Sequence, residues 1–155
     1  MNMHVKGTNT QVSILLVEDD DGDAKAVRRA FAAARISNPI IRLTNGAKAL
    51  QFLKQETEAT PPRRYILLVD VNMPVMNGHE MVAKLRETPE LNRSIVFMLT
   101  TSDDERDINA AYDNLVAGYI LKQTAGRDFL KLMEMLGAYW RLVEIPDISA
   151  NCGHI

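Results

Sequence analysis

The stretch over residues 65–78 places the strongest constraint on how this chain folds. The apolar run from Tyr65 to Val69 has the length and content of a strand buried on both faces of a parallel sheet. It ends in one carboxylate, Asp70, which would be costly to bury without a partner. A proline and the Asn77–Gly78 pair then break the run and set up a turn. The sequence thus predicts an aspartate at the edge of the sheet, where open α/β folds bind ligands. The alternative is that Asp70 only caps a loop or helix.

Strand patterns and helix patterns alternate five times along the chain. The predicted strands are Val12–Val17, Ile40–Leu43, Tyr65–Val69, Ser94–Leu99 and Val116–Leu121. The predicted helices cover residues 24–34, 47–54 and 78–87. We expect Asp103 to cap a fourth helix, which carries Ile108, Ala111, Tyr112 and Leu115 on one face, and a last helix to begin near residue 125. Such alternation predicts an α/β fold with helices on both faces of a five-stranded parallel sheet. Right-handed crossovers favour the flavodoxin-like strand order 2-1-3-4-5.

Length and composition favour one soluble domain. We expect an N-terminal arm over residues 1–11, a folded domain over 12–145 and a loose tail over 146–155. A net charge of −2 supplies no basic field for nucleic acid, and no apolar run is long enough to cross a membrane. The single cysteine, Cys152, cannot form an internal disulfide, which fits a cytoplasmic protein. The three histidines are scattered, and we expect them on the surface: His4, His79 and His154.

Polar residues follow four of the predicted strands. They are Glu18 and Asp19, Asp70, Thr100, and Lys122. Because the carboxyl ends of parallel strands share one rim, these side chains should meet there. Clustered carboxylates favour Mg²⁺, and an ammonium and a hydroxyl can hold phosphoryl oxygens, while a carboxylate can itself take up a phosphoryl group. Each residue alone could be a cap or a solvated strand end, but the joint pattern is hard to explain as coincidence.

The motifs at these strand ends resemble the receiver domain of two-component response regulators. They are Val17-Glu18-Asp19-Asp20, Val69-Asp70-Val71-Asn72-Met73-Pro74 with Asn77-Gly78, Leu99-Thr100-Thr101-Ser102, and Gly118-Tyr119-Ile120-Leu121-Lys122. The resemblance runs from about Ser13 to the end of the last helix. It implies that Asp70 accepts a phosphoryl group from a histidine kinase. It also implies that Asp19, Asp70 and the backbone carbonyl of Asn72 bind Mg²⁺, with Glu18 assisting directly or through water.

The same resemblance assigns the remaining site residues. Thr100, Thr101 and Lys122 would contact the phosphoryl group, and Tyr119 would be the aromatic that reorients on activation. Two departures stand out: Glu18 is longer than the aspartate of many receivers, and Lys122 precedes Gln123 where the family usually has a proline with a cis bond.

We expect no DNA-binding module, so the output should be a protein contact or a phosphate relay. A narrower resemblance, in the Pro61–Pro62 loop and the 139–146 ending, is to single-domain regulators paired with bacterial phytochromes, which implies a light-regulated sensor kinase as partner. The last helix has more apolar residues than one core-facing stripe needs, which predicts a homodimer through that helix unless the tail covers the excess. The apolar residues outside the stripe are Leu130, Met135, Tyr139, Leu142 and Ile145.

Three alternatives compete with this interpretation. An aspartate-nucleophile phosphatase of the haloacid-dehalogenase type would need a second acid two positions after Asp70, where this chain has Asn72. A flavin carrier would need a loop rich in Gly, Ser and Thr after the first strand, but this loop is acidic. A degenerate receiver would not need Asp70, Thr100 and Lys122 together. We therefore expect a phosphoacceptor that catalyses only its own phosphoryl transfer and dephosphorylation, not an enzyme.

Overall fold

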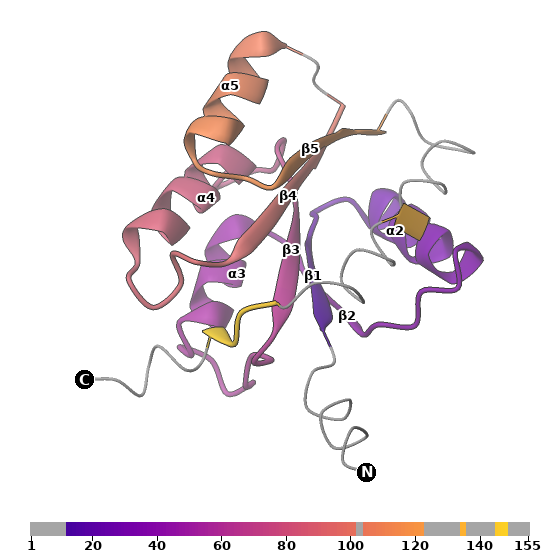
Figure 1. Ribbon diagram of the computed structural model, residues 1–155, viewed down its shortest axis with the longest axis horizontal. Helices are drawn as coiled ribbons and strands as arrows, with labels where there is room; N and C mark the ends of the chain where they lie inside the picture. Colours follow the sequence, from indigo (N-terminus) through magenta and orange to yellow (C-terminus); the bar gives the residue numbers. More distant parts are fainter. Residues whose placement is uncertain (1–11, 102–103, 123–133, 136–144, 149–155) are drawn as a thin grey trace.

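The computed structural model describes residues 12–101, 104–122, 134–135 and 145–148. Its strands form one parallel sheet in the order β2-β1-β3-β4-β5, as the sequence predicts. The bounds are β1 Ser13–Val17, β2 Ile40–Leu43, β3 Tyr65–Asp70, β4 Ile95–Thr100 and β5 Gly118–Leu121. The expected fold class is confirmed, and β3 lies at the centre of the sheet (Figure 1).

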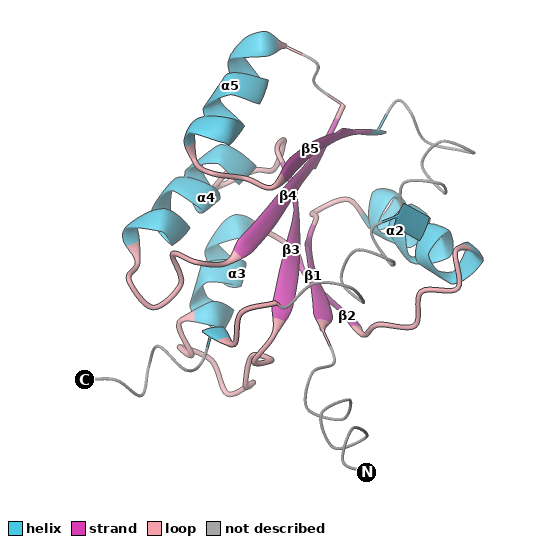
Figure 2. Cartoon of the chain, viewed as in Figure 1, coloured by secondary structure: helices cyan, strands magenta, loops and turns pink. Residues whose placement is uncertain are grey.

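The described helices cover the sheet from two sides. They are α2 Asp21–Ala33, α3 Gly46–Leu53, α4 Gly78–Glu87 and α5 Glu105–Asp113. Figure 2 shows α3, α4 and α5 on one side of the strands and α2 on the other. The sequence-based cap of α5 is wrong by one residue: Asp104 occupies the cap and accepts a hydrogen bond from the Arg106 backbone N–H, while Asp103 lies outside the described residues.

Alternating side chains of the strands build two cores, one on each face of the sheet. On β1, Leu15 and Val17 pack with the residues of α3 and α4, whereas Ile14 and Leu16 pack with those of α2. The other buried strands alternate in the same way, so both faces are apolar. This pattern explains why the strands appear in the sequence as continuous apolar runs and not as alternating ones.

The expected buried stripe of α5 is only partly correct. Ala111 is buried, but Tyr112 is 48% exposed and Leu115, just past the helix, is 72% exposed. The reason is position: α5 packs beside β5, at the edge of the sheet, where there are few neighbours to cover a wide apolar face. Helical spacing identifies the residues on one side of a helix, but it does not show how much of that side a sheet covers.

The described part of the C-terminal segment crosses the sheet at the end where the strands begin. Ile145 packs into the core under α2, and Ile148 packs into the core under α3 and α4. The Ile148 backbone N–H donates to the Arg63 carbonyl at 3.0 Å, and the Arg64 side chain donates to the Ile145 carbonyl at 3.3 Å. Figure 1 draws residues 145–148 in yellow. The prediction of a loose tail is therefore wrong for residues 146–148.

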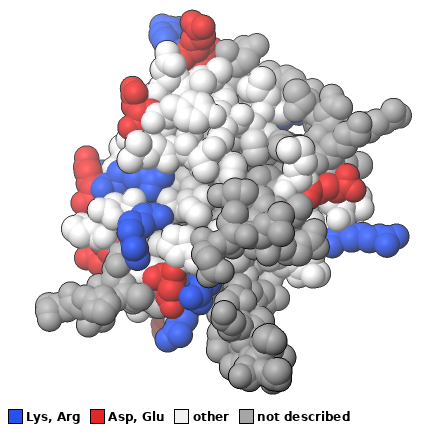
Figure 3. All heavy atoms as spheres, in the orientation of Figure 1, with Lys and Arg blue, Asp and Glu red and all other residues white. Residues whose placement is uncertain are grey.

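Within the described parts of the chain, no helix has the length and hydrophobicity that crossing a membrane requires. On the face shown in Figure 3, acidic and basic side chains alternate and do not gather by sign.

Candidate functional site

The alternation of the strands places three predicted site residues on the same face of the sheet. Glu18, Asp70 and Lys122 each lie two positions beyond a strand residue that packs in the core under α2. Those three strand residues are Leu16, Leu68 and Ile120. The three polar side chains therefore meet at the carboxyl end of the sheet, on the side that α2 covers.

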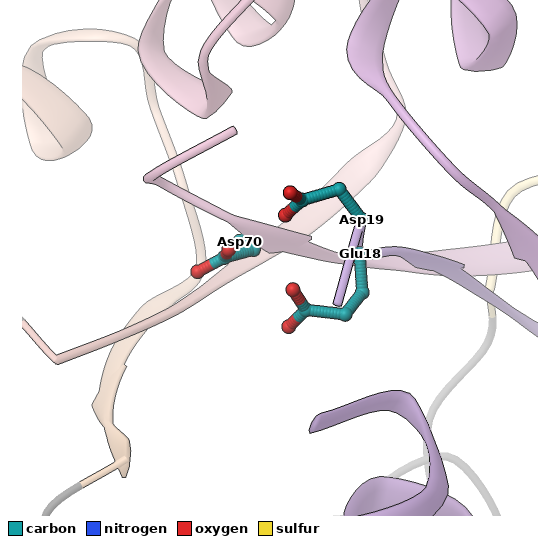
Figure 4. A group of neighbouring side chains, drawn as sticks. All are labelled: Glu18, Asp19 and Asp70. Carbon is teal, nitrogen blue, oxygen red and sulfur yellow. The ribbon is translucent and has the colours of Figure 1, made fainter. Parts of the chain in front are cut away.

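Three carboxylates form the acidic part of the site. Ligand oxygens of Glu18, Asp19 and Asp70 all lie within 4.8 Å of one another. Figure 4 shows the three carboxyl groups turning toward a common space beside the end of β3. Glu18 and Asp70 are buried and Asp19 is exposed, so the group opens to solvent on one side. Oxygen ligands at this spacing fit a hard divalent cation such as Mg²⁺.

Lys122 is the cation of the site. Its Nζ lies 2.8 Å from Glu18 Oε1, 2.7 Å from Asp23 Oδ2 and 3.3 Å from Asp70 Oδ1. Burial by itself would lower the pKa of Lys122, but the bonds to Asp23 and Glu18 and the charge of Asp70 raise it above the usual range. Lys122 is therefore positively charged at any physiological pH.

Burial makes the charged forms of the Glu18 and Asp70 carboxylates less favourable. Burial raises the pKa of Glu18 to about 7, against the opposing effect of its hydrogen bond from Lys122. Burial also raises the pKa of Asp70, and the charge of Lys122 offsets part of that rise. A divalent cation between these groups would favour their charged forms, which is a second reason why the residues present fit a metal.

The loop after β1 is held in place by contacts that the sequence did not reveal. Residues 18–21 are four consecutive acids. One of them, Asp20, caps α2 by accepting a hydrogen bond from the Asp23 backbone N–H at 2.8 Å. Arg42 of β2 donates to the backbone carbonyl of Glu18 at 3.0 Å and pairs with Asp21 at 2.7 Å. These bonds fix the direction in which Glu18 and Asp19 leave the strand.

The turn after Asp70 depends on Gly78. Asn77 and Glu80 form a reciprocal capping box at the start of α4. The Gly78 N–H donates to the Val71 carbonyl at 2.9 Å, and a Cβ on Gly78 would lie 2.5 Å from the Asp70 carbonyl oxygen. Only glycine lets α4 begin this close to the end of β3.

The other predicted residues lie at or near the same edge. Thr100 is buried at the end of β4, in register with Leu121, the residue before Lys122. Thr101 and Asn72 are exposed in the loops that follow β4 and β3. Tyr119 is half-buried and packs against the core under α3 and α4. The peptide bond between Lys122 and Gln123 involves a residue outside the described ranges.

Two residues differ from what the sequence suggested. His79 is not fully on the surface: its side chain is 20% exposed, and its Nε2 lies 3.6 Å from Asp107 Oδ1, between α4 and α5. Asp23, a first-turn residue of α2, makes the shortest contact to Lys122. Acidic residues are favoured at any helix start, so this second role had no signal in the sequence.

The sequence of this chain matches known proteins of one family. A model of the response regulator receiver domain matches residues 14–134. The chain belongs to this family. It is 34% identical over 134 residues to the response regulator Rcp1 of Synechocystis, a match that covers 86% of this chain and 91% of Rcp1. As a receiver, it acts in two-component signalling.

Solved structures of receivers agree with the fold. The Mn²⁺-bound form of Rcp1 superposes with a TM-score of 0.75 at 34% identity, covering 88% of this chain and 99% of the other. The phosphorylated cyanobacterial phytochrome response regulator RcpA gives a TM-score of 0.75 at 30% identity, covering 86% and 97%.

Proposed function

We propose that Asp70 is the phosphoacceptor of this receiver and takes its phosphoryl group from the phosphohistidine of a sensor histidine kinase. The observation that carries the proposal is the position of Asp70, which ends the central strand between the acidic pair and the Lys122 ammonium, 3.3 Å away. A new bond forms between an Asp70 carboxylate oxygen and phosphorus while the phosphorus–nitrogen bond of the donor breaks. The released imidazole keeps the electron pair and takes a proton from solvent.

The chain's own residues position and neutralise the group. Lys122 donates to the phosphoryl oxygens, and the hydroxyl of Thr100 and the adjacent Thr101 would complete the contacts. Tyr119 would report the change to the far face of the sheet. A bound Mg²⁺ would supply further positive charge, held by Asp19, Asp70 and the Asn72 carbonyl with help from Glu18.

Labelling with a small phosphoryl donor tests the acceptor. Incubation with acetyl phosphate and Mg²⁺ should add one phosphoryl group to the wild type and none to Asp70→Asn, as measured by intact mass. Asp113→Asn removes an exposed aspartate at the end of α5 and should label normally. Labelling of Asp70→Asn at the wild-type rate would move the acceptor elsewhere.

The metal assignment has its own test. Asp19→Ala should weaken Mg²⁺ binding and slow labelling much more than Glu18→Gln, because Asp19 has the shorter side chain and faces the open side of the acidic cluster. Titration calorimetry of Mg²⁺ measures this directly. Equal losses in both variants would make Glu18 a direct ligand.

The upstream partner is proposed to be a phytochrome-type sensor kinase. RcpA, which is 30% identical to this chain, is a cyanobacterial phytochrome response regulator. The expected output is a protein contact or relay in the cytoplasm, without DNA binding and without an enzymatic reaction on other substrates. Light-dependent transfer from a purified bacterial phytochrome kinase to Asp70 would support the pairing, and equal transfer from unrelated histidine kinases would contradict it.

We also propose a homodimer through the last helix. Of the five apolar residues outside its predicted stripe, the structure describes Met135, which is 68% exposed, and Ile145, which is buried; the others lie outside the described residues. Exposed Tyr112 and Leu115 on and just after α5 add apolar surface to a receiver face that commonly pairs. Sedimentation at micromolar concentration, with and without beryllofluoride, tests this. A monomer at all concentrations in both states would contradict it.

A further inference from the structure

The shortest contact of Lys122 is not to a residue of the acidic cluster. Its Nζ lies 2.7 Å from Asp23 Oδ2, compared with 2.8 Å from Glu18 Oε1 and 3.3 Å from Asp70 Oδ1. Asp23 stands in the first turn of α2, the helix that covers the face of the sheet on which Lys122 lies. It is absent from the group of carboxylates close enough to share a metal. Asp23 therefore contacts the lysine without belonging to the metal site.

Two of the three N–H groups of the Lys122 ammonium donate hydrogen bonds, to Glu18 Oε1 and to Asp23 Oδ2, and Asp70 Oδ1 lies 3.3 Å away. A lysine carries three N–H donors, and in this structure they face Glu18, Asp23 and Asp70. A phosphoryl group on Asp70 adds three acceptor oxygens with negative charge beside the same ammonium. Lys122 can bind them strongly only by moving toward Asp70, and that movement lengthens its bond to the acid on the helix.

We propose, on the basis of the function proposed above, that Asp23 is a positioning residue that holds Lys122 toward α2 and competes with the phosphoryl group for its ammonium. Asp23 is itself fixed, because its backbone N–H donates to the capping side chain of Asp20 at 2.8 Å. The Asp23 side chain is 48% exposed, so water can replace the lysine when the bond breaks. Asp23 thus lowers the affinity of the unphosphorylated site for phosphoryl groups without blocking it.

The size of the effect follows from the exposure of the pair. Exposed ion pairs change equilibria by up to about fivefold, because solvent and side-chain freedom offset most of the attraction. Asp23→Asn keeps the shape and the backbone hydrogen bond but removes the charge. It should tighten the binding of beryllofluoride, a phosphoryl mimic, by about two- to fivefold. It should also slow the loss of phosphate from labelled protein in the same proportion.

The matched control is Asp21→Asn, two residues earlier in the same turn. Asp21 carries the same charge but pairs with Arg42 instead of Lys122. It therefore measures the general effect of removing one negative charge near the site. Beryllofluoride affinity in saturating Mg²⁺ is read by fluorine NMR, and Mg²⁺ affinity alone is read by calorimetry. A role of Asp23 in kinase contact cannot contribute, because no kinase is present.

The expected result is tighter beryllofluoride binding in Asp23→Asn than in Asp21→Asn, with the same Mg²⁺ affinity in both variants. Equal beryllofluoride affinities in the two variants would overturn the inference and leave the proposed function intact. Weaker binding in Asp23→Asn would also overturn it, because Asp23 would then aim the lysine at the phosphoryl group. Wild-type protein that binds no beryllofluoride at all would overturn the proposed function and this inference together.

Discussion

Gly78→Ala should disturb the site without changing any charged residue. The new Cβ would lie 2.5 Å from the Asp70 carbonyl oxygen, 3.0 Å from the Val71 Cα and 3.1 Å from the Asp70 carbonyl carbon. All three atoms belong to the backbone at the end of the central strand, so no side chain can turn aside to make room. Overpacking of this kind costs about 1–3 kcal/mol, and a backbone obstacle favours the upper half of that range. Because Asp70 supplies two of the three atoms, its carboxylate should shift as well.

Urea denaturation and labelling by acetyl phosphate measure the two consequences. We expect Gly78→Ala to lose about 2–3 kcal/mol of unfolding free energy and to label more slowly than the wild type. Gly22→Ala is the matched control, since its Cβ would meet only the Asp20 side chain, at 3.2 Å. It should stay within about 0.5 kcal/mol of the wild type or gain slightly from helix propensity. Wild-type stability and labelling in Gly78→Ala would refute the close-approach argument.

Three further outcomes can be measured by denaturation. Without divalent metal, the contribution of Glu18 to stability should be fully present below about pH 4.5 and fall by roughly 1–2 kcal/mol as the pH rises through about 7, because the folded pKa of Glu18 exceeds its ordinary value of 4.5. The difference in stability between wild type and Glu18→Gln, followed against pH, should show this fall, and Mg²⁺ should reverse it. Ile148→Ala should cost about 2–4 kcal/mol, while Asp147→Asn, whose ion pair to Arg64 spans 4.0 Å, should cost under about 0.5. Arg86→Lys should cost about 2 kcal/mol, because the guanidinium donates to four backbone carbonyls that an ammonium cannot reach together.

The sequence predicts those features that depend on strands. Buried strands of a parallel sheet are continuous apolar runs, so their number and order follow from pattern and connection rules. Because parallel strands end on one edge, Glu18, Asp70 and Lys122 could be expected to meet, and in the structure they do.

Features that depend on how helices dock could not be predicted in this way. The contact between Asp23 and Lys122 requires the orientation of α2 against the sheet, which periodicity does not contain. The exposure of Tyr112 and Leu115 depends on the edge position of α5. The burial of Ile148 depends on four residues that cross the end of the sheet, too few to show any period.

The charges at the carboxyl end of the sheet account for the way this site would respond to its ligands. One ammonium, Lys122, faces Glu18, Asp23 and Asp70, and burial raises the pKa values of Glu18 and Asp70. A divalent cation would relieve the acids that point into the cluster, but it would not reach Asp23, which lies outside it. The ammonium would then have two competitors left, the carboxylate on α2 and the incoming phosphoryl group. Movement of Lys122 from Asp23 to the phosphoryl group would break the ion pair that joins β5 to the first turn of α2. Phosphorylation at the centre of the sheet would therefore change the contacts of a helix that carries no metal ligand.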